Sequence, residues 1–198
     1  METYRRLLAE IKPSYERTFY RDFSMNSRFI GIIGPRGVGK TTFLLHYLRT
    51  HYGDSDRALY VSADNLFFSA NTLLKLADDF VKWYDGKILC IDEIHRYKKW
   101  NQELKNIYDS YPNLKVIFSG SSSIDLIKGK YDLSRRVVLR TMHGFSFREY
   151  LEIQAGKKFD VIPLSQLINQ EAKTKKIGNT AKILRHFQKY LKWGYYPT

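Results

Sequence analysis

The sequence predicts an α/β protein built on a doubly wound, five-stranded parallel sheet. Short apolar runs alternate with longer segments in which apolar residues recur at helical spacing. A glycine-rich GxxxxGK[ST] pattern lies between the first run and a helix start, and two adjacent acids end the third run. Strand, helix and strand in alternation favour right-handed crossovers, and therefore parallel strands. We see no internal repeat.

The five runs expected to form strands span 29–33, 58–62, 87–93, 114–120 and 137–140. Between them, helical spacing predicts helices over 41–50, 71–84 and 98–111. The third of these ends at Pro112, which cannot continue a helix.

The sequence suggests three parts. Residues 1–27 form a helical prefix that we expect to pack on the sheet, and 28–152 form the core. Residues 153–198 form a helical segment with a short helix at 164–168 and a longer one at 180–193.

The glycine-rich pattern predicts a site for a nucleoside triphosphate. Glycines let backbone N–H groups turn inward around phosphates, and the next helix adds its positive end. Lys40 would reach the β and γ phosphates, and Thr41 would offer its hydroxyl to magnesium. The alternative is a glycine-rich turn with an exposed lysine. The residues expected to bind the nucleotide are Gly34, Pro35, Arg36, Gly37, Val38, Gly39, Lys40, Thr41 and Thr42.

The acid pair Asp92-Glu93 predicts the chemistry of that site. A buried parallel strand delivers its last side chains to the edge where ligands bind. Asp92 would hold Mg²⁺, and Glu93 would orient the attacking water. The alternative is an acidic helix cap. The sequence lacks the NKxD pattern of small GTPases, and the adjacent glutamate favours hydrolysis of ATP over nucleoside kinase chemistry.

Serines follow the fourth run, at 119–123. A hydroxyl there contacts the γ-phosphate or the water, or it caps a helix that starts at Ile124. Both interpretations remain open from the residues alone.

Composition narrows the classes of partner. The formal net charge of +13 over 198 residues favours anionic partners, although scattered Lys and Arg are typical of a solvated basic surface. A single cysteine, Cys90, excludes a disulfide within the chain, and no HExxH zinc pattern occurs. No apolar run has the length of a signal peptide core or a membrane span, so we expect a cytoplasmic protein without a membrane partner.

Five blocks, GPRGVGKTT, ILCIDEIHRYKKW, VIFSGSSS, LSRRVVLR and FSFREYL, resemble in order the prokaryotic AAA-type P-loop ATPases. The resemblance implies a three-layer P-loop NTPase with sheet order 5-1-4-3-2, a partial helical C-terminal lid, and ATP and Mg²⁺ as cofactors. The stretch 190–197 is similar to the family's YLxxGGxP, where the ATPase half meets a second, C-terminal domain. We therefore expect that domain to be missing from this sequence.

The resemblance also implies roles for Ser119, at the family's sensor position, and for Arg136, as an arginine that senses the γ-phosphate within or between subunits. Ser121 competes with Ser119. Arg135 stands where the family has glycine, which leaves open which of the two arginines acts.

Three functional hypotheses follow. The leading one is a magnesium-dependent ATPase that converts ATP to ADP, with Lys40, Glu93, Ser119 and Arg136 as catalytic residues. The second is a nucleotide-regulated binding module that hydrolyses slowly alone, because a homo-oligomer supplies the arginine. The third is nucleic-acid binding through the basic surface, with aromatic residues at 193–196 stacking on bases. The alternative for those aromatics is packing on the second domain.

Overall fold

The computed structural model describes residues 5–7, 15–121, 133, 135–161, 163–168 and 180–196. Their contacts divide the chain into two compact units, Met1–Met142 and His143–Thr198. The first unit therefore ends ten residues before the end expected for the core from the sequence. The segment after Met142 joins the second unit because its helix packs on the last helix of the chain.

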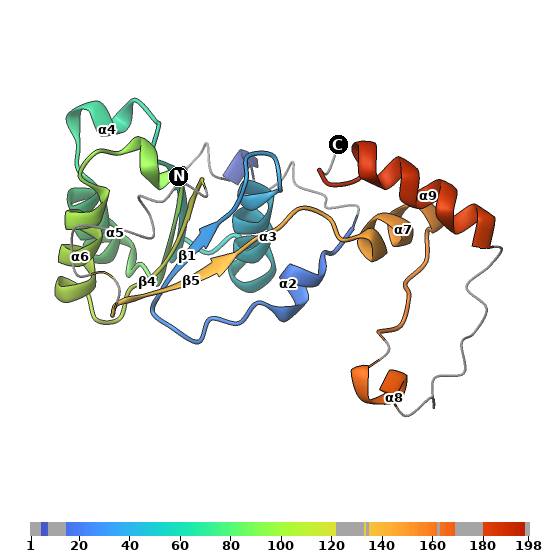
Figure 1. Cartoon of the computed structure of the whole chain (residues 1–198). Coiled ribbons are helices and arrows are strands. Elements are labelled where there is room, and N and C mark those ends of the chain that lie inside the picture. Colours follow the sequence, from blue (N-terminus) through green and yellow to red (C-terminus); the bar gives the residue numbers. More distant parts are fainter. Residues whose placement is uncertain are drawn as a thin grey trace. The chain divides into compact units, whose positions relative to one another are not determined.

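The first unit is built on a five-stranded sheet in the order β2-β3-β4-β1-β5 (Figure 1), with every pair of neighbours parallel. This confirms the predicted order. Strands β1 and β3 are buried along their whole length, and β4 is buried except at Lys115. This is expected for apolar strands covered on both faces. The strands are β1 (Phe29–Ile33), β2 (Ala58–Ser62), β3 (Ile88–Asp92), β4 (Lys115–Gly120) and β5 (Val137–Thr141).

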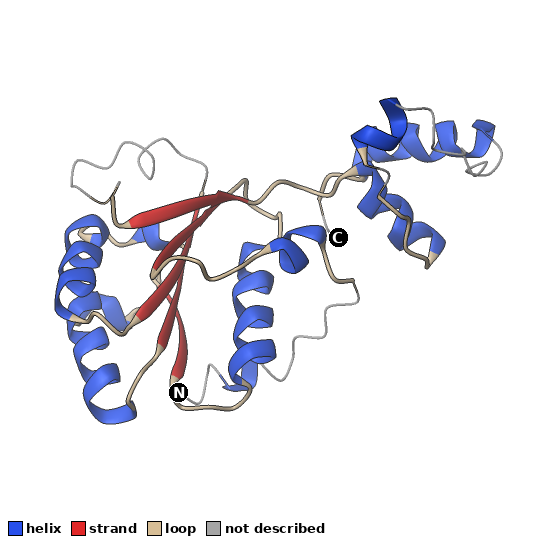
Figure 2. Cartoon of the chain, turned by 90° about the horizontal axis from the view of Figure 1, so that it is seen from below, coloured by secondary structure: helices blue, strands red, loops and turns tan. Residues whose placement is uncertain are grey.

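Helices cover the two faces of this sheet and complete three layers. Figure 2 shows α3 on one face and α5 with α6 on the other. A short helix, α4, and a 3-10 turn, η1, were not expected from the sequence. The helical elements are α3 (Lys40–Tyr52), α4 (Phe67–Ala70), α5 (Leu73–Tyr84), η1 (Ile94–Arg96) and α6 (Trp100–Ser110).

The N-terminal prefix packs on α3 through an aromatic cluster. Its helix α2 (Thr18–Asp22) and the residue after it bring Phe19, Tyr20 and Phe23 to ring-centroid distances of 4.8–5.2 Å from Phe43 of α3. The three rings also pack against the hydrophobic core of the first unit. That the prefix as a whole packs on the sheet stays a prediction.

The second unit contains α7 (Phe147–Ala155), α8 (Leu164–Ile168) and α9 (Thr180–Trp193). A capping box starts α7: the Ser146 hydroxyl accepts from the Glu149 N–H, and the Glu149 carboxylate accepts from the Ser146 N–H. The rings of Phe147 and Phe187 join α7 to α9 at 5.0 Å. Among the described helices, none combines the length and the apolar character needed to cross a membrane.

Candidate functional site

The P-loop, residues 34–42, follows the carboxyl end of β1 and shows why glycine is required. Gly37 and Gly39 have φ of 84° and 94°, which only glycine adopts readily. Gly34 is crowded instead, since a Cβ there would lie 2.2 Å from the Met142 carbonyl oxygen. Helix α3 begins at Lys40, and its N-cap Gly39 has no side chain to accept from the first-turn N–H groups. These groups remain available for an anion.

Lys40 folds back over the loop that precedes it. Its Nζ donates to the carbonyl oxygens of Gly34 and Pro35, at 3.0 and 2.9 Å, and the residue is 5% exposed. Burial lowers the pKa of Lys40, while the nearby carboxylates of Glu93 and Asp92 act in the opposite direction. The loop thus holds a buried cation beside two acids.

Asp92 lies at the end of β3 and is 3% exposed. Its Oδ2 accepts from the Thr41 hydroxyl at 2.6 Å and from the Tyr60 hydroxyl at 2.9 Å. Its Oδ1 accepts from the Ser119 hydroxyl. Burial and the neighbouring Asp92 charge raise the pKa of Tyr60, so its hydroxyl stays a donor.

The pair Thr41 and Asp92 fits a magnesium ion. Mg²⁺ prefers oxygen ligands and is usually bound by one or two protein groups together with phosphates and water. The two oxygens lie 2.6 Å apart at the edge of the P-loop. In the part of the chain that the structure describes, no group of three or more His, Cys, Asp and Glu could hold a metal.

Glu93 has a left-handed backbone, with φ of 51°, which is uncommon for a residue other than glycine. Its N–H donates to Asp92 Oδ1 and to Ser119 Oγ, both at 3.1 Å, and these bonds hold that conformation. The Glu93 side chain is about one-third exposed, and Oε2 lies 3.3 Å from His95 Nε2. Glu93 makes no side-chain capping bond to η1, which argues against the helix-cap alternative for this acid.

Ser119 is fully buried and joins the two acids, since its hydroxyl contacts Asp92 Oδ1 and the Glu93 N–H. Ser121 instead donates its backbone N–H to His95 Nδ1 at 3.5 Å. The helix expected to start at Ile124, with the serine cap considered for it, lies outside the described residues.

Arg136 is not brought to the P-loop. It precedes β5, whose first residue Val137 pairs with Phe29, whereas the P-loop follows the opposite end of β1. A five-residue strand spans about 16 Å. The Arg136 guanidinium donates from Nε to Asp109 Oδ1 at 3.1 Å and lies 5.7 Å from the ring of Tyr108. A role for Arg136 at a neighbouring subunit stays a prediction.

Three residues near the site were not found from the sequence. Arg17, from the prefix, is 5% exposed and donates to the Val38 carbonyl oxygen of the P-loop at 2.8 Å. Tyr60 and His95 contact Asp92 and Glu93 as described above. The position of His95 two residues after Glu93 was a usable signal. Arg17 and Tyr60 carry no such signal.

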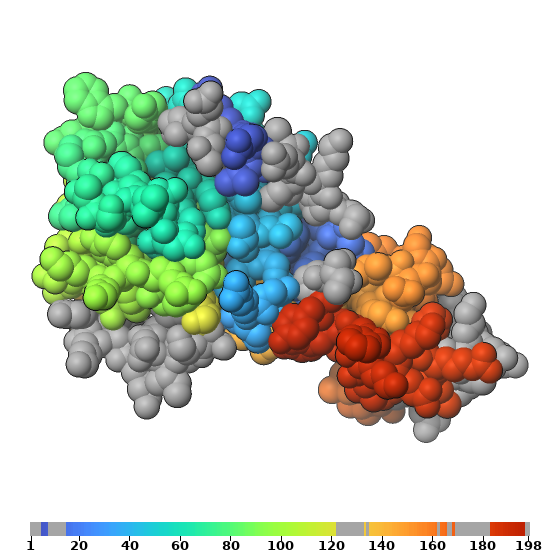
Figure 3. Space-filling view, turned by 90° about the horizontal axis from the view of Figure 1, so that it is seen from above, coloured from blue at the N-terminus to red at the C-terminus, as the bar shows by residue number. Residues whose placement is uncertain are grey.

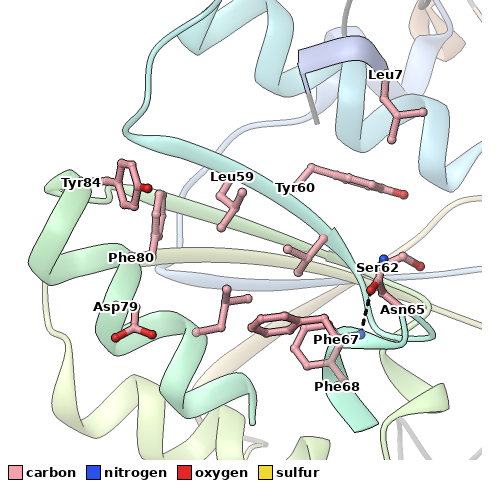
Figure 4. A pocket seen from close by; sticks show the side chains of 12 residues that line it. Leu7, Leu59, Tyr60, Ser62, Asn65, Phe67, Phe68, Asp79, Phe80 and Tyr84 are labelled. Carbon is pink, nitrogen blue, oxygen red and sulfur yellow. Dashed lines mark hydrogen bonds between the residues drawn. The ribbon is translucent and has the colours of Figure 1, made fainter. Parts of the chain in front are cut away.

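A groove of about 580 Å³ is lined in part by Tyr60 (Figure 4). Residues of β2 and α5 form its walls, together with Phe67 and Phe68 of α4 and Leu7. No P-loop residue lines it. The groove is largely apolar, so it does not itself offer a phosphate site. Tyr60 connects it to the P-loop region, because the Tyr60 hydroxyl donates to Asp92.

The chain is similar to a protein from an archaeon. An uncharacterised protein of Methanocaldococcus jannaschii is 33% identical over 147 residues, which are 70% of this chain and 30% of that protein. This chain therefore spans less than a third of that relative's length.

Solved structures are similar to this chain at low identity. DnaA of Aquifex aeolicus bound to AMPPCP has a TM-score of 0.47 and 16% identity, and the match covers 98% of this chain and 60% of that one. PCH-2 of C. elegans has a TM-score of 0.44 and 15% identity, covering 90% of this chain and 48% of that one.

The family comparison covers most of the first unit. The AAA domain family matches residues 26–151, which is more than half of the chain. The matched range contains the P-loop, the acid pair and all five strands. The chain therefore belongs to the AAA domain family, the prokaryotic AAA-type P-loop ATPases that its sequence resembles.

Proposed function

We propose that this protein is a magnesium-dependent ATPase of the AAA class that hydrolyses ATP to ADP and phosphate. The observation that carries the proposal is the contact of Thr41 with Asp92 at the edge of the P-loop, next to Lys40 and Glu93. A cation, oxygen ligands for magnesium and a carboxylate beside them are the groups that a P-loop hydrolase uses.

Each group has a task in this proposal. The loop amides and Lys40 bind the phosphates and offset charge that develops on the γ-phosphate. Thr41 and Asp92 hold Mg²⁺, which when bound neutralises charge on the phosphate oxygens. Glu93 orients the attacking water and takes its proton. The position of Glu93 is supported by the two hydrogen bonds that its backbone N–H donates, to Asp92 and to Ser119.

Replacing Lys40 tests the binding half of the proposal. We expect Lys40→Ala to abolish detectable ATP binding and turnover, because the change removes the buried ammonium from the loop. The measurement is titration of ATP, GTP and CTP with and without Mg²⁺, followed by phosphate release. Lys75→Ala, at an exposed lysine of α5, is the control and should leave both unchanged. ATP binding by Lys40→Ala at native affinity would exclude this pocket.

Tyr60 gives a narrower prediction for the magnesium ligand. Tyr60→Phe keeps the ring and removes the hydroxyl that donates to Asp92 Oδ2. A hydrogen bond to a charged group contributes about 1.5–3 kcal/mol, and its loss can change the affinity for a bound ion by about tenfold or more. We expect the Mg²⁺ concentration for half-maximal hydrolysis to shift by that factor. Tyr84→Phe, in the same groove but away from Asp92, should not shift it. An identical magnesium dependence in both variants would contradict this role of Tyr60.

A second candidate function is a nucleotide-regulated module that hydrolyses slowly by itself. The ion pair of Arg136 with Asp109, at the sheet edge opposite the P-loop, favours it. An arginine supplied by a neighbouring subunit contributes about 10³- to 10⁵-fold in P-loop enzymes. Specific activity that rises with protein concentration would favour this candidate, and constant specific activity would favour the complete enzyme.

A further inference from the structure

Helix α9 of the second unit has a packed side and an exposed side. The packed side contacts α7: the Tyr190 ring lies 5.4 Å from Phe147, and its hydroxyl donates to the Phe145 carbonyl oxygen at 2.7 Å. The chain after α9 is also fixed, since the Phe145 N–H donates to the Tyr195 carbonyl oxygen at 2.8 Å. Figure 3 shows α9, in red, at the surface. Its orientation within the unit is therefore defined.

The exposed side carries a row of cations, which we call the basic stripe: Arg185, Lys189 and Lys192. Residues spaced by three or four positions share one face of a helix. All three residues are exposed. The stripe is thus opposite the face that holds Tyr190.

Acidic residues do not balance the basic stripe. Helix α9 contains no Asp or Glu. In the described part of the second unit, Glu149 is engaged in the capping box of α7, and Glu152 accepts from the Phe159 N–H and pairs with Lys158. Asp160, the third acid described there, is exposed and forms no ion pair with a described residue. No ion pair joins an acid to Arg185, Lys189 or Lys192 among the described residues.

This arrangement differs from an ordinary solvated helix. Like charges three and four positions apart repel and destabilise a helix, and surface helices usually intersperse acids among such cations. Helix α5 in the same chain does so, because Lys75 pairs with Asp79 and Lys82 pairs with Asp78. The uncompensated charge of α9 is therefore best explained by an anionic partner.

An exposed aromatic ring ends the stripe. Trp193 is 79% exposed, although indole is among the largest apolar side chains, and it directly follows Lys192. Tyr196 is 47% exposed close by in the sequence. Cations that follow a phosphate backbone, combined with aromatic rings on which bases stack, are the pattern of proteins that bind single-stranded nucleic acid.

We propose that the basic stripe and Trp193 bind single-stranded nucleic acid, with the cations on phosphates and the indole stacked on a base. A duplex would satisfy the cations but would leave the indole without an accessible base face. This surface lies in the second unit and does not depend on ATP hydrolysis.

The proposal predicts two separable effects on binding of a labelled oligo(dT), measured by fluorescence anisotropy from about 50 to 200 mM salt without nucleotide. The first variant replaces the three cations of the basic stripe, Arg185, Lys189 and Lys192, by Gln, which is a good helix former. We expect it to reduce the slope of log affinity against log salt concentration by about 2, because each phosphate contact contributes about 0.7 to that slope. Trp193→Ala should weaken binding about tenfold with an unchanged slope, because stacking releases no counterions.

A matched control changes the same charge elsewhere. Lys98, Lys99 and Lys115 are exposed on the first unit, and their joint replacement by Gln should leave the slope as in the native chain. The proposal is overturned by a native slope in the Arg185/Lys189/Lys192 variant, by an equal loss in the control, or by tighter binding to duplex than to oligo(dT). Binding of α9 to anionic vesicles without binding to oligo(dT) would assign the stripe to a lipid surface instead.

Discussion

Glu93→Gln is expected to lower ATP turnover by about 10²- to 10⁴-fold while ATP binding is retained. The substitution keeps the size of the side chain and removes the carboxylate that, in our proposal, orients and deprotonates the attacking water. The binding groups are untouched, because the Glu93 backbone N–H still donates to Asp92 and Ser119. Phosphate release under saturating ATP and Mg²⁺, together with a separate measurement of ATP affinity, checks both halves.

Glu103→Gln is the matched control for that experiment. Unlike the partly exposed Glu93, Glu103 is buried, and it accepts from the Tyr97 hydroxyl at 2.7 Å and from the Leu74 N–H at 3.0 Å, between α5 and α6. Its loss should lower stability and leave turnover per folded molecule close to native. A Glu93→Gln enzyme with native turnover would remove Glu93 from the chemistry, even if Lys40→Ala still abolished binding.

Gly34→Ala is expected to have the largest effect on the P-loop itself. The new Cβ would lie 2.2 Å from the Met142 carbonyl oxygen, whereas carbon and oxygen in close contact are separated by about 3.3 Å. The neighbour is backbone, so the loop must move by about 1 Å. We expect the free energy of unfolding to fall by about 1–3 kcal/mol and ATP affinity to fall about 10²-fold.

Gly53→Ala separates crowding from backbone strain. Gly53, after α3, has φ of 54°, yet a Cβ there would meet no atom within 4 Å. We expect a loss of about 1–2 kcal/mol in stability from the positive φ and native affinity for ATP. Thermal unfolding and ATP titration of the two variants make the comparison. Equal ATP affinities would mean that the contact of Gly34 with Met142 does not shape the loop.

Much of the first unit could be predicted because its signals are local. The strands are apolar runs bounded by turn residues, and β1 and β2 have the predicted bounds. The P-loop glycines are required by backbone angles and close approach at single positions, which a sequence pattern captures. Asp92 and Glu93 were found because they follow a buried strand, and parallel strands bring their carboxyl ends to one edge.

What could not be predicted depends on contacts between distant segments. Tyr60 reaches Asp92 because β2 and β3 are neighbours, and no local pattern identifies one tyrosine among the chain's fifteen. Arg17 contacts the P-loop from the prefix, whose helix α2 packs on Phe43, and these segments are far apart in the sequence. The position of Arg136, in contrast, could have been predicted. It precedes a parallel strand, so it lies at the amino ends of the strands, whereas the P-loop follows the carboxyl end of β1.

The junction between the two units has a mechanical consequence. Met142 is the last residue of the first unit, and its N–H donates to the Ile33 carbonyl oxygen at 2.7 Å, next to Gly34. The last residue of the first unit is therefore bonded to the backbone that immediately precedes the P-loop. A change of backbone conformation at Met142 would be felt first at Gly34.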